Sequence, residues 1–253
     1  MPNIVAIAGP HGAGKSTSAP LLIGQRLGIR EVVNADVIAA GLSAFAPEKV
    51  AIEAGRAMLR RLDELAEAGV DFAFETTLAS RSFAPWIARL QKERGYRFHL
   101  VFLWLPSADE AVRRVATRVQ RGGHSIPPEV IQRRYLRGIA NFLSLYSPIA
   151  DSWAIYDNSR SARMIASRDP GREPQIQDPA IWRTIMSQVN VREQEGAYQT
   201  GGIGIMGVPF DEITRVLQEA ARNAWREHKA LGHPIVIWRD GKVVIVPPEE
   251  IEL

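Results

Sequence analysis

The feature that most constrains the fold is a glycine-rich stretch near the N-terminus, GPHGAGKST at residues 9–17. It matches the phosphate-loop pattern G-x-x-x-x-G-K-[ST] at every fixed position. In this pattern backbone N–H groups surround a triphosphate, Lys15 reaches the β- and γ-phosphates, and the Ser16 hydroxyl ligates Mg²⁺. An apolar β-run over 3–8 and a helix-compatible segment over 16–27 flank the loop, so phosphates are expected at a helix N-terminus. The sequence therefore predicts a nucleoside triphosphate site.

Length and composition fit one globular domain of ordinary size plus a small appendage, with 253 residues of which 46% are hydrophobic and 23% charged. No apolar run approaches the length of a membrane span, and no basic-then-apolar leader precedes the first strand, so no membrane association is expected. The absence of cysteine excludes disulfides and thiolate metal sites and, with the phosphate loop, favours a cytoplasmic enzyme. The net charge of +3 is too small to argue for a nucleic-acid partner.

Five β-runs alternate with helical patterns along most of the chain. This alternation predicts an α/β P-loop NTPase fold with a doubly wound, mostly parallel, five-stranded sheet in the order 2-3-1-4-5. The expected strands are 3–8, 31–34, 70–74, 98–105 and 153–157. The expected helices are 47–68, 83–94, 108–120, 129–145 and 179–191.

A change in composition divides the chain. Residues 193–205 carry four glycines and no periodicity, which is typical of a linker between a P-loop domain at 1–192 and a module at 206–253. The module contains an amphipathic helix and a β-hairpin around Asp240-Gly241. Its hairpin strands are apolar on both faces, so a single helix cannot cover them. We therefore expect the module to dock on its own P-loop domain or on another copy of the chain.

Two acidic residues stand where strands end, which is where an open α/β sheet binds its ligands. Asp36 follows the second strand and Glu75 ends the third. A carboxylate close to the γ-phosphate can accept a proton from an attacking hydroxyl or hold Mg²⁺ through water. Asp36 as a helix N-cap and Glu75 as a surface carboxylate remain alternatives. Thr76 and Thr77 either cap the next segment or bind substrate.

The nucleotide site is expected to take its residues from the phosphate loop and from the end of the fifth strand. Asn158 at that strand end either contacts the base or belongs to a simple turn. The predicted nucleotide-binding residues are Gly9, Pro10, His11, Gly12, Ala13, Gly14, Lys15, Ser16, Thr17 and Asn158. Of these, His11 occupies a variable position of the pattern.

An arginine-rich segment follows the fourth strand. Its seven arginines are accompanied by one acid, Glu129; they are Arg113, Arg114, Arg118, Arg121, Arg133, Arg134 and Arg137. The turn at 122–127, GGHSIP, is suited to the hinge of a lid. Lid arginines can neutralise the charge that phosphoryl transfer spreads over the equatorial oxygens while the lid excludes water. The alternative is a solvated charged face.

Over residues 3–160 the chain resembles the zeta-toxin-like branch of P-loop kinases. The resemblance rests on GPHGAGKST, NADVIAAGLS, FAFETTLAS, RVATRVQRGGHSIPPEVIQRRY and IYDNS, taken in this order. It implies phosphorylation of a hydroxyl by ATP with Mg²⁺, in several members on the sugar of UDP-N-acetylglucosamine. The resemblance also implies catalytic roles for Lys15 at the phosphates, Asp36 as the base, Glu75, and the lid arginines Arg118, Arg121 and Arg134. Residues implied or expected at the acceptor are Asn34, Asp36, Glu75, Thr76 and Thr77.

The sequence departs from the superfamily pattern at the fourth strand, which ends in LWLP without an aspartate. Mg²⁺ would then depend on Ser16, on the phosphates and on waters held by Asp36 or Glu75. At the other end of the chain, residues 226–234 and the WRDGKVV hairpin resemble the small partner proteins found beside such toxins. The module is thus antitoxin-like, and we hypothesise that it keeps a toxic kinase silent. A structural cap or a dimerisation arm is the alternative.

Two other functions share parts of this pattern. A polynucleotide or nucleoside 5′-kinase has the same loop, aspartate and lid. A P-loop switch ATPase without a small-molecule acceptor has the loop, but the sequence contains neither an N-K-x-D guanine motif nor the L-S-G-G-Q signature of transporter ATPases. A lid rich in arginine suits transfer to a bound acceptor better than regulated hydrolysis.

Overall fold

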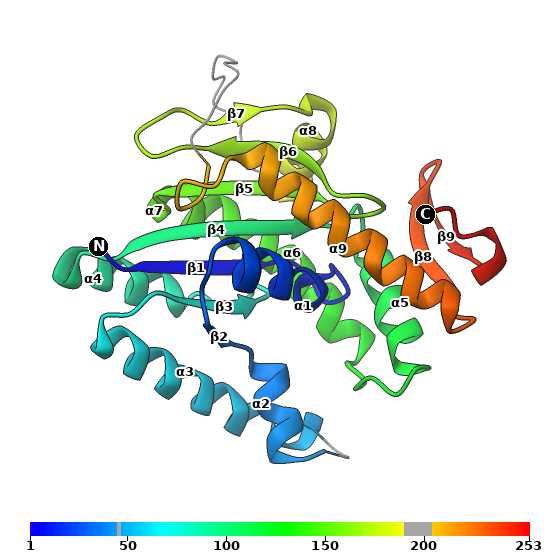
Figure 1. Cartoon of the computed structure of the whole chain (residues 1–253), viewed down its shortest axis with the longest axis horizontal. Coiled ribbons are helices and arrows are strands. Elements are labelled where there is room, and N and C mark those ends of the chain that lie inside the picture. Colours follow the sequence, from blue (N-terminus) through cyan, green and yellow to red (C-terminus); the bar gives the residue numbers. More distant parts are fainter. Residues whose placement is uncertain (45–46, 190–203) are drawn as a thin grey trace.

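The computed structural model describes residues 1–44, 47–189 and 204–253, and its centre is a seven-stranded sheet in the order β2-β3-β1-β4-β5-β6-β7 (Figure 1). The strands of this sheet are β1 (Asn3–Ala8), β2 (Glu31–Val33), β3 (Phe72–Thr76), β4 (Arg97–Trp104), β5 (Ser152–Asp157), β6 (Arg163–Arg168) and β7 (Gln175–Ile176). The first five are parallel, which confirms the predicted class and order, and β6 and β7 extend the sheet antiparallel.

Helices cover both faces of the sheet, with α1 and α9 in front of it and α4 and α6 behind it in Figure 1. The α-helices are α1 (Lys15–Ala19), α2 (Ala35–Leu42), α3 (Ala51–Ala68), α4 (Phe83–Arg94), α5 (Ala108–Val119), α6 (Pro128–Asn141), α7 (Ser147–Ile149), α8 (Pro179–Gln188) and α9 (Phe210–Ala230). The other helical segments are η1 (Pro20–Arg26), η2 (Pro47–Val50), η3 (Phe142–Tyr146) and η4 (Pro248–Glu250). In the part of the chain that the structure describes, no helix is long and apolar enough to cross a membrane.

Several helices begin and end where the local chemistry requires. The Ser107 hydroxyl caps α5 by accepting from the backbone N–H of Glu110 at 3.1 Å, but the Glu110 carboxylate makes no hydrogen bond in return, so only half of the predicted capping box forms. The Asp178 carboxylate caps α8 in the same way. Gly69 and Gly95 end α3 and α4 with φ of 67°, a left-handed conformation that glycine adopts without strain. These local signals explain why the predicted helix boundaries lie close to the observed ones.

The sheet differs from the prediction in two places. β3 covers Phe72–Thr76 instead of 70–74, so Glu75 and Thr76 lie within the strand end beside β1. The sequence reasoning also missed β6 and β7. β6 begins and ends with an arginine, and only its centre is buried. It pairs with β5 across a register shift between Ile155 and Tyr156. Its apolar run was too short to signal a strand.

The C-terminal segment packs on the P-loop domain of its own chain. Phe210, Ile213 and Leu217 of α9 belong to the main hydrophobic core. The Tyr156 hydroxyl donates to the carbonyl of Phe210 at 3.3 Å, and the Gln218 amide donates to the carbonyl of Ala162 at 2.9 Å. Docking in cis is therefore what the structure shows, and the division of the chain into separate domains stays a prediction.

The hairpin β8 (Ile235–Arg239) and β9 (Lys242–Val246) has the predicted bounds and a small core of its own. Most of the predicted linker lies outside the described residues, but its last two positions are packed. Gly204 donates its N–H to Asp169 at 2.8 Å, and Ile205 is fully buried. An isolated bridge between Ile205 and Val208 anchors the start of the C-terminal segment, and the linker at 193–205 stays a prediction.

Because α9 shares the main core, its apolar face should stabilise the whole chain. Leu217→Ala is expected to lower the global free energy of unfolding by about 2–5 kcal/mol, the usual cost of truncating a buried leucine. Leu231→Ala, at a side chain that is 59% exposed just beyond α9, should change it little. Urea unfolding followed by circular dichroism measures both. A separate early transition for the C-terminal segment, with the main transition unchanged in Leu217→Ala, would contradict the shared core.

Candidate active site

The phosphate loop runs from the end of β1 to the start of α1 and lies against three other elements. A Cβ at Gly9 would stand 2.2 Å from the backbone oxygen of Leu103, and one at Gly12 would stand 2.9 Å from Cβ of Arg114. Gly9 and Gly12 also have φ of 140° and 78°, which disfavour any side chain. The close approach of loop and neighbours therefore requires glycine, as the phosphate-loop pattern predicts.

Lys15 is half-buried, and its Nζ donates to the carbonyls of Gly9 and Pro10 at 2.9 Å each. Burial lowers the pKa of Lys15 from its ordinary value to about 8, while the charges of Glu75 and Asp36 oppose the shift. The two predicted carboxylates thus share the pocket with this ammonium group. A bound polyphosphate would supply negative charge, which stabilises the protonated form of Lys15 in this pocket.

Ser16 and Glu75 meet at the start of α1. The Ser16 hydroxyl donates to Oε2 of Glu75 at 2.8 Å. A hydroxyl and a carboxylate are the hard oxygen donors that Mg²⁺ prefers, so these two side chains fit a magnesium ion. Among the described residues, no group of three or more acidic, histidine or cysteine side chains could hold a metal. Phosphate oxygens and water would have to complete the coordination.

Asp36 lies in the first turn of α2, but it does not cap the helix. The cap is Asn34, whose Oδ1 accepts from the backbone N–H of Asp36 at 2.8 Å. The Asp36 carboxylate is 51% exposed and lies 3.8 Å from Nε2 of His124 in the α5–α6 turn. It is therefore available to accept a proton, whereas the Asn34 oxygen, predicted at the acceptor, is engaged in capping.

Thr76 and Thr77 make local backbone contacts. Their hydroxyl oxygens accept from the backbone N–H groups of Leu78 at 3.0 Å and Ala79 at 3.4 Å. Such contacts are typical of the turns that threonine stabilises. The capping alternative thus describes both side chains here, and a contact with substrate stays a prediction.

The three lid arginines point to different partners. Arg134 of α6 donates to Nε2 of His11 at 3.0 Å, and Arg118 of α5 donates to the carbonyl of His124 at 3.3 Å. Because a guanidinium can only donate, the ring nitrogen of His11 must accept. Burial, with Lys15 and Arg134 adding to it, lowers the pKa of His11 to about 2, so the ring stays neutral. Arg134 therefore lies beside the phosphate loop, and Arg118 lines the same pocket as the loop.

Arg121 instead reaches the C-terminal segment. Its guanidinium donates to the imidazole of His228 on α9 and to the carbonyl of Pro234 before β8. Arg113 adds a second tie, from α5 to the carbonyl of Val243 at 3.3 Å. Arg121 thus lines the same pocket as Arg118, but its guanidinium is paired with the C-terminal segment, and its predicted catalytic role stays a prediction.

The sequence did not predict the ion pair of Glu110 with Arg114, which joins α5 to the phosphate loop and to the segment after β5. Arg114 donates to the carbonyls of Asn158 and Ser159 at 3.0 and 2.6 Å and reaches the carbonyl of Gly12 at 3.4 Å. Its guanidinium lies 2.6 Å from Oε1 of Glu110, although the two are not aligned as a hydrogen bond. Glu110 is fully buried, and burial raises its pKa to about 7. The i,i+4 spacing of opposite charges was the available signal.

Asn158 completes the attachment of the loop after β5 to the phosphate loop. Its amide Nδ2 donates to the carbonyl of Ala13 at 2.8 Å, and a Cβ at Gly14 would lie 2.9 Å from the same nitrogen. The side chain therefore holds the phosphate loop from the side of β5. Its predicted contact with the base remains a prediction.

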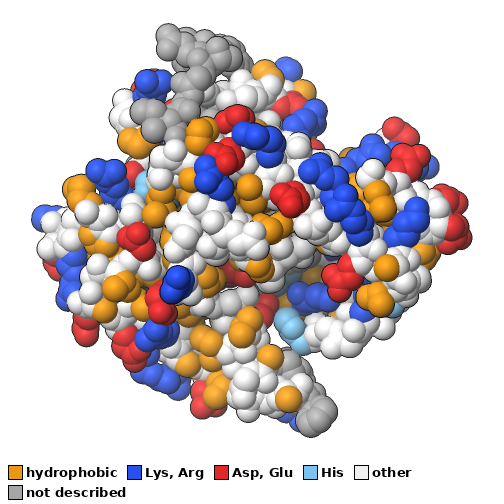
Figure 2. Space-filling view, in the orientation of Figure 1, with side chains coloured by type: hydrophobic (Ala, Val, Ile, Leu, Met, Phe, Trp, Pro, Cys, Tyr) orange, Lys and Arg blue, Asp and Glu red, His pale blue; other side chains and the backbone are white. Residues whose placement is uncertain are grey.

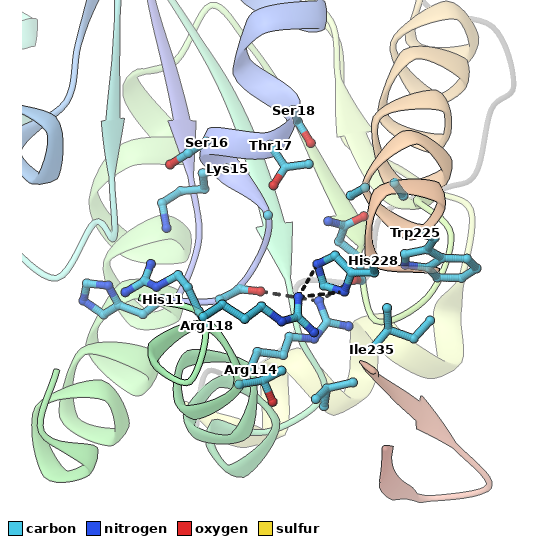
Figure 3. Close-up of a pocket in the computed structure, with 18 of the residues that line it drawn as sticks. His11, Lys15, Ser16, Thr17, Ser18, Arg114, Arg118, Trp225, His228 and Ile235 are labelled. Atoms are coloured by element: carbon cyan, nitrogen blue, oxygen red, sulfur yellow. Dashed lines mark hydrogen bonds between the residues drawn. The ribbon is translucent and has the colours of Figure 1, made fainter. Parts of the chain in front are cut away.

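One pocket of about 400 Å³ is lined by Lys15, Ser16, Asp36, Glu75, Arg114, Arg118, Arg121 and Asn158, whereas Arg134, Asn34, Thr76 and Thr77 are not part of its lining. In Figure 2 a hollow opens between the part of the molecule that carries α2 and the part that carries α5, with basic and histidine side chains on its wall. Figure 3 shows Lys15 and Ser16 on one side of the pocket and Trp225, His228 and Ile235 on the other. The pocket also contains Ser18, Thr117 and Arg160, which the sequence reasoning did not select.

Comparison with known proteins places the chain in a family. A family model described as Zeta toxin matches residues 1–169. The chain belongs to the zeta toxin family. An uncharacterized protein of Haemophilus influenzae is 29% identical over 127 residues, which cover 50% of this chain and 88% of that protein. This family membership agrees with the phosphate loop and its neighbours as the structure places them.

Solved structures show the same fold at low identity. AvrRxo1-ORF1 with AvrRxo1-ORF2 and ATP aligns with a TM-score of 0.63 at 16% identity, covering 88% of this chain and 76% of that chain. The structure of the same pair with sulphate ions aligns with a TM-score of 0.62 at 17% identity and covers 74% of this chain. This chain spans 64% of the length of that structure's chain. At these identities the likeness shows the fold alone.

The lowered pKa of Lys15 predicts a pH-dependent affinity for ATP. In the free protein Lys15 loses its proton as the pH rises through about 8, and bound phosphates favour the charged form. Affinity should therefore fall with rising pH, by about tenfold for each unit above the free pKa. Calorimetric titration with Mg-ATP from about pH 7.5 to about pH 9 measures it. Lys15→Arg is the control, since its guanidinium does not titrate there. An affinity of the natural protein that is constant over this range contradicts the prediction.

Proposed function

We propose that the protein is an ATP- and Mg²⁺-dependent kinase that phosphorylates a hydroxyl of a small molecule, a nucleotide-sugar such as UDP-N-acetylglucosamine. The observation that carries the proposal is that Asp36 and Glu75 face Lys15 in one pocket with the phosphate loop. A carboxylate beside the γ-phosphate is what transfer to a hydroxyl needs. Membership of the zeta toxin family supports the nucleotide-sugar as acceptor.

In the proposed reaction the chain's residues hold the reactants and move one proton. Asp36 accepts the proton of the acceptor hydroxyl as its oxygen bonds to the γ-phosphorus. The bond to the bridging oxygen breaks, and its electron pair leaves on ADP. Lys15 balances charge on the β- and γ-phosphates, and Arg118 and Arg134 are placed to neutralise the equatorial oxygens. Ser16 and Glu75 would hold Mg²⁺, which neutralises phosphate charge when bound.

Space for an acceptor exists beside the nucleotide pocket. A second cavity of about 630 Å³ shares Ser16 and Glu75 with the first. It continues along β2 past Val33 and Asn34 to the side chain of Arg61. Its apolar strand residues and its charged far end could accommodate a molecule with both a ring and polar groups. A nucleotide-sugar has this character.

Transfer of label tests the reaction class. The protein is incubated with γ-labelled ATP and UDP-N-acetylglucosamine, and in parallel with a metabolite extract and with an oligonucleotide. We expect the label on the nucleotide-sugar. Asp36→Asn should keep ATP binding and lower turnover by roughly 10²–10⁴-fold, the scale of losing a general base. Label on the oligonucleotide would favour a polynucleotide kinase, and label only in free phosphate would favour a switch ATPase.

We also propose that the C-terminal segment restrains this kinase in cis, as an antitoxin-like module. The related AvrRxo1-ORF1 was solved with a second protein, AvrRxo1-ORF2. In the present chain the contact that supports restraint is that of Arg121 with His228 and Pro234, which engages the donors of an arginine that lines the nucleotide pocket. Lid arginines serve mainly the transition state, so the restraint should act on turnover rather than on ATP binding.

His228→Ala removes the imidazole partner of Arg121. Losing a charge-assisted hydrogen bond of roughly 1.5 kcal/mol should raise the fraction of freed Arg121, and with it kcat, by about tenfold. Because His228 also lines the pocket, the dissociation constant for ATP is measured alongside and should change much less than kcat, and expression should slow growth. His233→Ala, on the same turn, is the matched control. Equal kcat in both variants and in the natural protein would contradict restraint and favour the alternative that the segment is a structural cap or a dimerisation arm.

A further inference from the structure

We propose that α9 and β8 form the nucleobase end of the nucleotide pocket, so that the C-terminal segment is part of the ATP site. This inference rests on the proposed function insofar as the pocket binds a nucleoside triphosphate. It goes further, because it assigns a ligand-binding role to a segment for which the sequence suggested a restraint, a structural cap or a dimerisation arm. Docked in this way, the segment would allow the nucleotide to bind while Arg121 stays paired with His228 and Pro234.

The chemistry of the pocket wall carries the proposal. Every lining residue that comes before the C-terminal segment is glycine, polar or charged. The apolar lining residues of the pocket are Ala221, Ala224, Trp225, Ile235 and Val236. All of them belong to α9 or β8. A nucleobase offers two apolar faces, and among the described residues that line this pocket the apolar side chains that could receive one come from the C-terminal segment.

The direction of the pocket agrees with this assignment. Lys15 and Ser16 mark where the phosphates would sit, and Figure 3 shows Trp225 and Ile235 on the opposite side. Arg118 of α5 lies between these two sides. A triphosphate on the loop therefore directs its nucleoside toward α9 and β8. The polar end of the ligand meets the polar wall, and its apolar end meets the apolar wall.

The docked segment leaves room for a ligand. The pocket keeps about 400 Å³ with α9 and β8 in place, within the range of small-molecule sites. A segment that blocked the nucleotide would be expected to fill this space with side chains. Instead, Ala221 and Ala224 present the smallest apolar side chains of α9 to it. The segment therefore behaves as a wall rather than as a plug.

The wall is held in place before any ligand binds. Ile213 and Leu217 anchor the first half of α9 in the main core. Farther along, Trp225 packs on the hairpin core that includes Ile235 and Ile237. A rigid wall loses little conformational entropy when a base is placed on it, so the contact adds to affinity.

Affinity for ATP compared with affinity for inorganic tripolyphosphate tests the proposal, because only ATP carries a base. Ala224→Leu puts a larger side chain into the space for the base, and Trp225→Ala removes part of the apolar surface. Each should weaken Mg-ATP binding by about tenfold. Binding of tripolyphosphate should stay within about twofold of the natural protein. Ala230→Leu places the same substitution on an exposed position of α9 and serves as the control. Calorimetry gives the constants, and thermal unfolding shows that each variant is folded.

The outcomes separate the inference from the function on which it rests. Equal ATP affinity in Ala224→Leu, Ala230→Leu and the natural protein would overturn the proposal that α9 and β8 receive the base. Tighter ATP binding in Trp225→Ala would also overturn it. Failure of the natural protein to bind either ligand overturns the proposed kinase itself. Should Trp225→Ala unfold the hairpin, Ala224→Leu still decides, because leucine is a good helix former and Ala224 is only half-buried.

Discussion

The close packing of the phosphate loop against its neighbours is the constraint on which the site depends. At Gly9 the loop touches the backbone of β4, at Gly12 it touches α5, and at Gly14 it faces Asn158 after β5. Arg114 then joins α5 to the loop and to the segment after β5, with Glu110 buried beside it. Backbone N–H groups can surround phosphates only if the loop is fixed in shape beforehand. Here three elements of the fold fix it.

The C-terminal segment extends this arrangement to the rest of the pocket. Its helix begins in the main core at Phe210, passes α1, and ends beside α5, where Arg121 contacts His228. The same segment thus packs on the main core, lines one side of the pocket and contacts Arg121. These contacts explain how a stretch too small to fold alone can be ordered.

Local patterns predicted those parts of the protein whose cause is local. The phosphate loop, the α4 bounds, the Ser107 cap and the hairpin around Asp240 follow from residues close in sequence. The features that the sequence did not predict depend on residues that are far apart along the chain. Arg121 meets a histidine 107 positions away, and Glu110 is buried only because α5 packs against the loop after β5. β6 has charged ends, so its pairing with β5 could not be read from periodicity.

The central claim is that one pocket, walled by both ends of the chain, binds the nucleotide. Hydrogen–deuterium exchange with and without Mg-ATP tests it most directly, because it reports on every wall in one measurement. The account predicts slower exchange in residues 9–17, in α5, and in α9 and β8 when ATP is added. Unchanged exchange in the phosphate loop would contradict nucleotide binding there. Faster exchange in α9 and β8 would show that ATP displaces the C-terminal segment, contrary to the shared pocket.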